Sequence, residues 1–212
     1  MHADHLALDL AVTVRHDGHG GVADDLADPA GLTRWVRARA DALRADLAAG
    51  PYAAATFTAD DAALAAAVEV RTAVRALFAR AVLPGLPSSA DADRLPPARQ
   101  ALDRLNAAAA LVPVTPRLDW PQDGTATATR TVAGAPAAAD LVAAALARHA
   151  IGFLASPDRD RLRACPAPRC VRYFVKEHAR QEWCKPSCGN RARVARHHAR
   201  HRAAAADSAD PA

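Results

Sequence analysis

Aromatic side chains are scarce in this chain of 212 residues, at 4% of the sequence, although hydrophobic residues together make up 51%. Much of the apolar content is alanine, which favours helices but buries little surface. The sequence contains no uninterrupted run of about 18 apolar residues, which argues against a membrane span. Its first residues, MHADHLALDL, lack the basic segment that opens a secretory signal. We therefore expect a soluble, mainly helical, cytoplasmic protein with no membrane partner.

The chain also lacks an even distribution of charge. Its length suits one ordinary domain plus a small appended module, because a single core usually spans about 100 to 200 residues. Between Arg159 and Arg202, thirteen Lys or Arg residues stand against three acids, a charge of +10. Since the whole chain carries +4, the remaining residues carry −6. The sequence therefore predicts an acidic body with a strongly basic C-terminal segment.

The apolar pattern of the body predicts four helices and one hairpin. Period-two alternation over residues 6–14 fits a short strand, but such a run could equally open a helix. Helical spacing and capping residues predict the helices in chain order: from Thr33 to before Gly50, from Thr58 to before Pro84, over 97–111 and over 137–155. Two β-leaning runs separated by PQDG predict a hairpin near 114–132. We expect an α+β fold, mainly α with a β-hairpin, whose helical domain covers residues 1–155.

No cysteine occurs in the first 164 residues, and four then follow in the pattern C-x4-C-x13-C-x3-C: Cys165, Cys170, Cys184 and Cys188. Each short spacing can bring two sulfur atoms to within about 2.3 Å of one ion, and the intervening loop brings in the second pair. Disulfides, which are rare in cytoplasmic proteins, and an iron–sulfur centre are the alternatives. His178 could replace one cysteine, although four paired thiols make that unnecessary. The spacing predicts one structural Zn²⁺ and a treble-clef-like or knuckle-type finger over residues 159–202.

The predicted finger offers little apolar material of its own. Val171, Tyr173 and Val175 alternate as in a short strand, while Phe174 and Trp183 provide bulk for a small core. A module of about 40 residues cannot fold on such a core alone, so the metal must supply much of the folding free energy. We expect the last residues, 203–212, to be disordered.

A basic helix is predicted from about Ser187 onward. At 100° per residue, Arg193, Arg196 and Arg200 fall within an arc of about 60°. Val194 points away from them, so that side could pack on the zinc ligands. Because zinc with four thiolates contributes −2, residues 159–202 would keep a charge near +8, which favours a polyanionic partner.

Nucleic acid is the partner that this charge predicts, although a basic helix facing only solvent is the simpler reading. Few aromatic side chains are available for stacking on single strands, which favours duplex DNA over RNA. Asn190 and Arg191 have the side chains best suited to base edges, but Asn190 could instead cap or bond the loop beside the metal. The predicted nucleic-acid-binding residues are Asn190, Arg191, Arg193, Arg196, Arg200, Arg202, Lys185 and Arg172.

These motifs resemble a known pair of domains. The segment from Leu162 to Arg202 is similar to the CGNR zinc finger, whose hallmark tetrapeptide is present as Cys188, Gly189, Asn190 and Arg191. The whole chain resembles bacterial proteins that join an N-terminal ABATE domain to this finger and are described as stress-induced transcription regulators. LALDLAVTV is similar to the family stretch LALDFxNT, from which it departs at Leu10 and Val12. The resemblance implies zinc on the four cysteines and a DNA-binding finger.

Three functions compete at this point. The first is a transcription regulator whose body senses a small-molecule effector or forms a homodimer while the finger binds DNA. The second is an RNA-binding or ribosome-associated zinc module. The third is an enzyme in the body, with His149 or the cluster of His16, Asp17 and His19 as candidates. Because no glycine-rich phosphate-binding motif or nucleophile elbow is present, we expect no enzyme activity.

Overall fold

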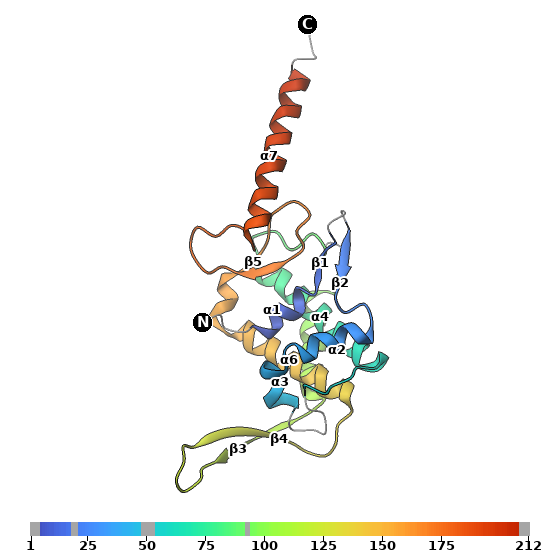
Figure 1. Cartoon of the computed structure of the whole chain (residues 1–212), viewed down its shortest axis with the longest axis vertical. Coiled ribbons are helices and arrows are strands. Elements are labelled where there is room, and N and C mark those ends of the chain that lie inside the picture. The colour runs from blue at the N-terminus through green and yellow to red at the C-terminus, as the bar shows by residue number, and fades with distance from the viewer. Residues whose placement is uncertain (1–4, 18–20, 48–53, 92–93, 208–212) are drawn as a thin grey trace.

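The computed structural model describes residues 5–17, 21–47, 54–91 and 94–207, and it consists of helices joined by three small antiparallel hairpins (Figure 1). The helices are α1 (Leu6–Ala11), α2 (Pro29–Arg37), α3 (Ala40–Leu47), α4 (Asp61–Ala81), α5 (Ala98–Ala110), α6 (Ala138–Ala155) and α7 (Pro186–Asp207), with a 3₁₀ turn η1 (Pro157–Arg161). The hairpins pair β1 (Val14–His16) with β2 (Val22–Asp24), β3 (Val114–Asp119) with β4 (Thr127–Val132), and β5 (Leu162–Ala164) with β6 (Tyr173–Val175). The prediction of an α+β fold, mainly α with a β-hairpin, is confirmed, and the structure adds two further hairpins.

Helices α4, α5 and α6 pack against one another and form the centre of the body, and α1 contacts both α4 and α6. Their contacts rely on alanine at the interfaces and on a few large side chains, among them Leu10, Phe78 and Leu141, which are fully buried. Helix α6 is long and apolar enough to cross a membrane by length and composition alone. However, half of it is buried against the rest of the chain, as expected of a core helix.

The helix predicted from Thr33 to before Gly50 is instead two helices, α2 and α3, separated by a turn at residues 38–39. The N-cap is Asp28, whose carboxylate accepts a hydrogen bond from the Gly31 N–H at 2.6 Å. Thr33 lies inside α2, where its hydroxyl accepts from the Ala59 N–H at 2.9 Å. The prediction of one continuous helix failed because the same apolar stripe continues across the turn. The predicted end before Gly50 lies outside the described residues.

Two further boundaries differ from the sequence prediction. The second long helix begins at Asp61 because Asp60, and not Thr58, caps it by accepting from the Ala63 N–H at 2.8 Å. The ambiguous run over residues 6–14 forms α1 followed by the first residue of β1. In α1, Leu6 and Leu10 are buried on one face, so the run follows the helical period rather than the strand period.

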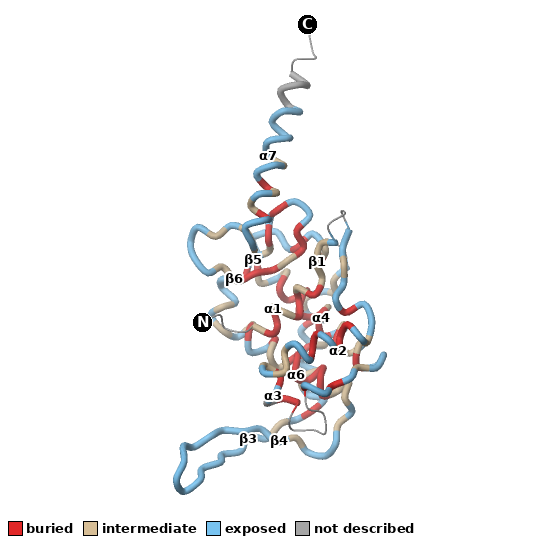
Figure 2. The backbone as a smooth tube through the Cα atoms, in the orientation of Figure 1, coloured by how far each residue is buried: buried red, intermediate tan, exposed pale blue. Residues whose placement is uncertain are grey.

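The β3–β4 hairpin projects from the body at the end opposite α7 (Figure 1). Both of its faces are solvent-exposed along most of its length (Figure 2), and Leu118 and Trp120 are 66% and 70% exposed. In the antiparallel register, Pro116 pairs with Arg130 and Arg117 pairs with Thr129. Arg130 and Arg117 therefore lie on opposite faces of the hairpin.

The finger is attached to the body through the β5–β6 hairpin. Leu162 and Tyr173 are buried in the main core, and the Tyr173 ring lies edge-on to Phe78 with ring centroids 5.5 Å apart. Tyr173, which was predicted on a short strand of the finger, therefore belongs to the body core. Phe174 and Trp183 do pack with the cysteines, as expected.

A buried polar network reinforces this attachment. Arg75 in α4 donates to the Asp91 carboxylate at 2.7 Å, and the Tyr173 hydroxyl donates to the same carboxylate at 2.6 Å. The Ser88 hydroxyl donates to the Val171 carbonyl at 2.9 Å. Burial and the neighbouring Asp91 charge raise the pKa of Tyr173, so its hydroxyl stays protonated as a donor. Removing any one partner would leave a buried charge or polar group unsatisfied.

Candidate metal centre and basic helix

The four cysteine sulfur atoms lie within 4.8 Å of one another. The Sγ–Sγ distances are 3.7 Å between Cys170 and Cys184, 3.5 Å between Cys184 and Cys188, and 3.8 Å between Cys188 and Cys170. Four sulfurs placed tetrahedrally about 2.3 Å from one zinc ion would be about 3.8 Å apart. A disulfide would need about 2.05 Å. The cluster therefore fits one structural zinc ion, and all four cysteines are free thiols.

Local backbone structure places each pair of ligands. Between β5 and β6 the chain makes a tight turn in which the Cys170 N–H donates to the Ala167 carbonyl at 2.9 Å. Arg169 takes the left-handed conformation there, with φ of 62°. The second pair lies at the start of α7, whose first residue is Pro186, a residue favoured at that position. A knuckle at a hairpin tip followed by a ligand-bearing helix agrees with the small zinc finger that the spacing predicted.

Two of the four thiols, Cys170 and Cys184, differ in how readily they lose a proton. Hydrogen bonds with Cys165 and Cys184 lower the pKa of Cys170, whereas hydrogen bonds with Cys165 and Cys170 raise the pKa of Cys184. A divalent cation would remove this difference between the two thiols, because it binds cysteine in the thiolate form. The Cys184 N–H also points at the Cys165 sulfur, at 3.5 Å, and so supports a thiolate there.

Each residue of the CGNR tetrapeptide has an identifiable contact in the finger. Cys188 is fully buried with the other sulfurs. Gly189 lies beneath Trp183, because a Cβ added at Gly189 would come within 2.9 Å of the indole Cδ1 atom. The Asn190 side-chain carbonyl accepts a hydrogen bond from Arg193 at 3.0 Å. The contacts of Cys188 and Gly189 hold the first turn of α7 against the metal centre, whereas the Asn190–Arg193 hydrogen bond lies within the helix.

Arg191 is only partly exposed and faces the zinc ligands. Its guanidinium donates to the Pro168 carbonyl in the first knuckle at 3.1 Å, and it lies 4.0 Å from the Cys188 sulfur. It therefore joins the two halves of the finger and places a positive charge beside a centre whose net charge is about −2. The sequence suggested base contacts for Arg191, and the structure adds this role within the finger.

Beyond Ala192, α7 leaves the rest of the molecule and projects along its long axis (Figures 1 and 2). Lys185 and Asn190 are exposed at its base, and Arg172 is half-buried in the β5–β6 hairpin, where its carbonyl accepts from the Cys165 N–H at 2.9 Å. The arginines further along the helix are exposed: Arg193, Arg196, Arg200 and Arg202. Val194 is 55% exposed, so the expected packing of that side on the knuckles is wrong.

Helix α7 also continues further than predicted. It runs to Asp207, so the first part of the tail expected to be disordered is helical. The alanine run after Arg202 explains this, because alanine has the highest helix propensity. The rest of that predicted tail, 208–212, lies outside the described residues.

The candidate catalytic residues have structural partners. His149 Nε2 lies 3.0 Å from the carboxylate of Asp46, which is buried. Asp17 accepts from the Gly21 N–H at 3.0 Å, and His16 lies in the small hairpin β1–β2. His19 lies outside the described residues.

Comparison with known families matches both parts of the chain. The ABATE family, described as "Putative stress-induced transcription regulator", matches residues 4–157, and the CGNR zinc finger matches residues 161–201. The chain belongs to the ABATE family. No curated protein matches it as a relative. In this ABATE protein the CGNR match covers all four clustered cysteines, so the resemblance seen in the sequence is confirmed.

Sequence reasoning missed two features of this ABATE protein. One is the Arg75–Asp91–Tyr173 network, whose signal was the position of Arg71 and Arg75 four residues apart among the apolar residues of α4. The other is the grouping of Asp46 with Arg148 and His149, which lie about 100 residues apart from it in the chain. No local pattern brings such distant residues together.

Proposed function

We propose that this protein is a zinc-dependent transcription regulator that binds duplex DNA through helix α7. One observation carries the proposal: a centre of four cysteines holds one end of a long exposed helix, and no acidic residue occurs in that helix between Pro186 and Ala206. Outside residues 159–202 the chain carries a net charge of −6, because those residues carry +10 of a total of +4. Lys and Arg that replace counterions on a phosphate backbone supply most of the sequence-independent affinity for DNA.

The zinc centre serves this function indirectly. When bound, zinc supplies the closed four-thiolate coordination that fixes the start of α7. The exposed face of Arg193, Arg196 and Arg200 then approaches phosphates, while Asn190 and Lys185 at the base of the helix are nearest to base edges and backbone. Because one finger makes few base contacts, the proposal includes a homodimer, which doubles the contacts and sets a half-site spacing.

The body has a sensing or dimerising role in this proposal and no catalytic one. The apolar side chains of Leu118 and Trp120, exposed on the projecting hairpin, favour a contact with another protein surface. We place the protein in the cytoplasm, where DNA and a reducing environment for four thiols are both present.

The test measures binding to a labelled DNA duplex by fluorescence anisotropy over a range of salt concentrations. The variant combines Arg193→Ala, Arg196→Ala and Arg200→Ala. Loss of three phosphate contacts should weaken binding and make the slope of log K against log salt shallower by roughly 2.7. A matched control removes three exposed arginines of the body, Arg34, Arg99 and Arg117, with the same change in net charge.

Equal effects of the two triple variants, or unchanged binding in the α7 variant, would remove the proposal. Competition with a structured RNA of equal length at fixed salt separates the alternative function. If that RNA displaces the duplex at lower concentration than unlabelled DNA does, the protein is an RNA-binding module instead.

A further inference from the structure

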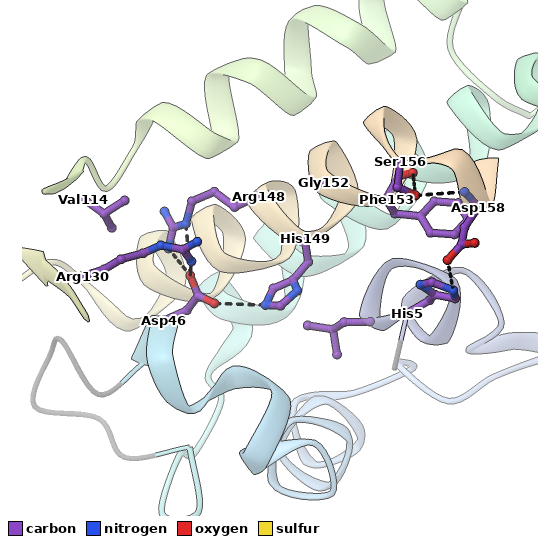
Figure 3. A pocket seen from close by; sticks show the side chains of 11 residues that line it. His5, Asp46, Val114, Arg130, Arg148, His149, Gly152, Phe153, Ser156 and Asp158 are labelled. Carbon is purple, nitrogen blue, oxygen red and sulfur yellow. Dashed lines mark hydrogen bonds and ion pairs between the residues drawn. The ribbon is translucent and has the colours of Figure 1, made fainter. Parts of the chain in front are cut away.

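A cavity of about 510 Å³ opens in the body at the base of the β3–β4 hairpin (Figure 3). It takes Leu6 from α1, Asp46 from α3, Arg130 from β4 and both Arg148 and His149 from α6. Its other end is formed by His5, Ser156 and Asp158, beside the 3₁₀ turn that leads from the body into the finger. The volume is in the range of small-molecule sites, which is about 300 to 1,000 Å³.

The basic end of the cavity is organised around one buried carboxylate. The Asp46 side chain is 3% exposed and accepts hydrogen bonds from Arg148 Nε at 3.2 Å and Nη2 at 3.0 Å. The remaining Arg148 amino group donates to the Val112 carbonyl at 3.1 Å. Burial alone would raise the pKa of Asp46, but His149 and Arg148 outweigh it and lower the pKa below its ordinary value. Asp46 is therefore ionised and already neutralised by Arg148.

Arg130 adds a second positive charge that this carboxylate does not need. Its Nη1 atom lies 3.9 Å from Asp46, too far for a hydrogen bond, and its side chain is 55% exposed. Within the described part of the chain, its guanidinium makes no hydrogen bond to another side chain or carbonyl. Figure 3 shows Arg130 and Arg148 converging on Asp46 from one end of the cavity. The Arg130 donors are thus available to an anion.

The middle of the cavity is apolar, whereas at the far end the Asp158 carboxylate lies 2.9 Å from His5 Nε2. Leu6, Val114 and Phe153 line the apolar part, and Phe153 lies edge-on to the His5 ring with ring centroids 5.0 Å apart. An inorganic anion would leave this surface in contact with water. An apolar group attached to the anion would cover this surface and exclude water from it, which is favourable in proportion to the apolar area buried.

We propose that this cavity binds a small organic carboxylate, whose charged group pairs with Arg130 and whose apolar body, about the size of one ring, lies against Leu6 and Phe153. Its position between the body helices and the entry to the finger makes it a site for the effector in the proposed function. That regulatory meaning rests on the proposed function, whereas the binding itself does not.

The experiment uses the full, zinc-loaded chain and isothermal titration calorimetry with three probes: benzoate, its neutral analogue benzamide, and inorganic phosphate. Benzoate should bind at least about tenfold more tightly than benzamide, because only the carboxylate forms a charge-assisted bond. Arg130→Ala should weaken benzoate by a similar factor. Arg117→Ala is the matched control, because Arg117 is an exposed arginine on the opposite face of the same hairpin, and it should leave benzoate binding unchanged.

A steric variant tests the apolar part of the site. A Cβ at Gly152, which lines the cavity, would meet no atom within 4 Å, so Gly152→Phe should fold and block benzoate. Benzoate that fails to bind, that binds no better than benzamide or phosphate, or that binds equally to the Arg130→Ala variant would overturn the proposal. DNA binding is measured on the same preparations. If the protein binds benzoate but not DNA, only the proposed function is refuted. If it binds DNA but not benzoate, only the carboxylate site is refuted.

Discussion

Replacement of Arg191 by alanine should weaken zinc binding, because Arg191 contacts both halves of the finger. The lost interaction is the hydrogen bond from its guanidinium to the Pro168 carbonyl at 3.1 Å, together with its charge 4.0 Å from the Cys188 sulfur. A hydrogen bond from a charged donor contributes about 1.5 to 3 kcal/mol, and the partial exposure of this one favours the lower end. About 1.5 kcal/mol corresponds to a roughly tenfold loss of zinc affinity.

The assay is competition for zinc between the purified protein and a chromogenic chelator at neutral pH. Arg193→Ala is the matched control, because it removes the same charge from the same helix, where the side chain is exposed and contacts only Asn190 among the described residues. Its zinc affinity should stay within about twofold of the wild type. Arg191→Lys should recover only part of the loss, since an ammonium lacks the planar fork of the guanidinium. Equal zinc affinities for Arg191→Ala and Arg193→Ala would refute this assignment.

Three other outcomes follow from the described contacts. Tyr173→Phe should lower the free energy of unfolding by about 1 to 3 kcal/mol in urea titrations, since a buried carboxylate loses a donor; an unchanged midpoint would contradict that network. Gly189→Ala should weaken zinc binding and alter Trp183 fluorescence, because the new Cβ would come within 2.9 Å of the indole. Gly152→Ala places its Cβ in open space on helix α6, so it should instead stabilise the protein by up to about 1 kcal/mol. The pKa of Asp46 is lowered in the folded state from 3.8, so its stabilisation is complete above that value and is lost as the pH falls through the folded pKa. Unfolding measured at pH 7 and about pH 3 should show a smaller pH effect in Asp46→Asn, and equal pH effects would count against the Asp46 ion pairs.

Local patterns in the sequence were sufficient for the features that depend on spacing. The two short cysteine spacings predicted the metal centre, because a few residues of turn fix how closely two sulfurs can approach. The long helices α4, α5 and α6 were predicted within a few residues, because their apolar periodicity extends over several turns. Asp28 followed by Pro29 was an available start signal for α2 that the apolar stripe concealed.

Features that depend on packing between distant segments were not predictable in this way. The turn between α2 and α3 has no Gly or Pro; there Arg39 stacks over Trp35 with its guanidinium carbon 4.5 Å from the ring centroid and pairs with Asp9 at 2.8 Å. Periodicity alone also placed Tyr173 on a strand without showing that its ring enters the body core. The same limit applies to the exposure of Val194, because a helix that leaves the body needs no apolar face beyond its first turns.

The projection of α7 separates the charges of the molecule. From Ala192, the last buried residue among those of α7 whose burial is described, to Arg202 the helix advances about 15 Å, at about 1.5 Å per residue. Electrostatic repulsion decays over about 8 Å at physiological ionic strength. Solvent would therefore screen a polyanion bound at the outer turns of α7 from the negative charge of the body. The surface of the body could gain or lose acidic residues with little effect on the affinity for that polyanion.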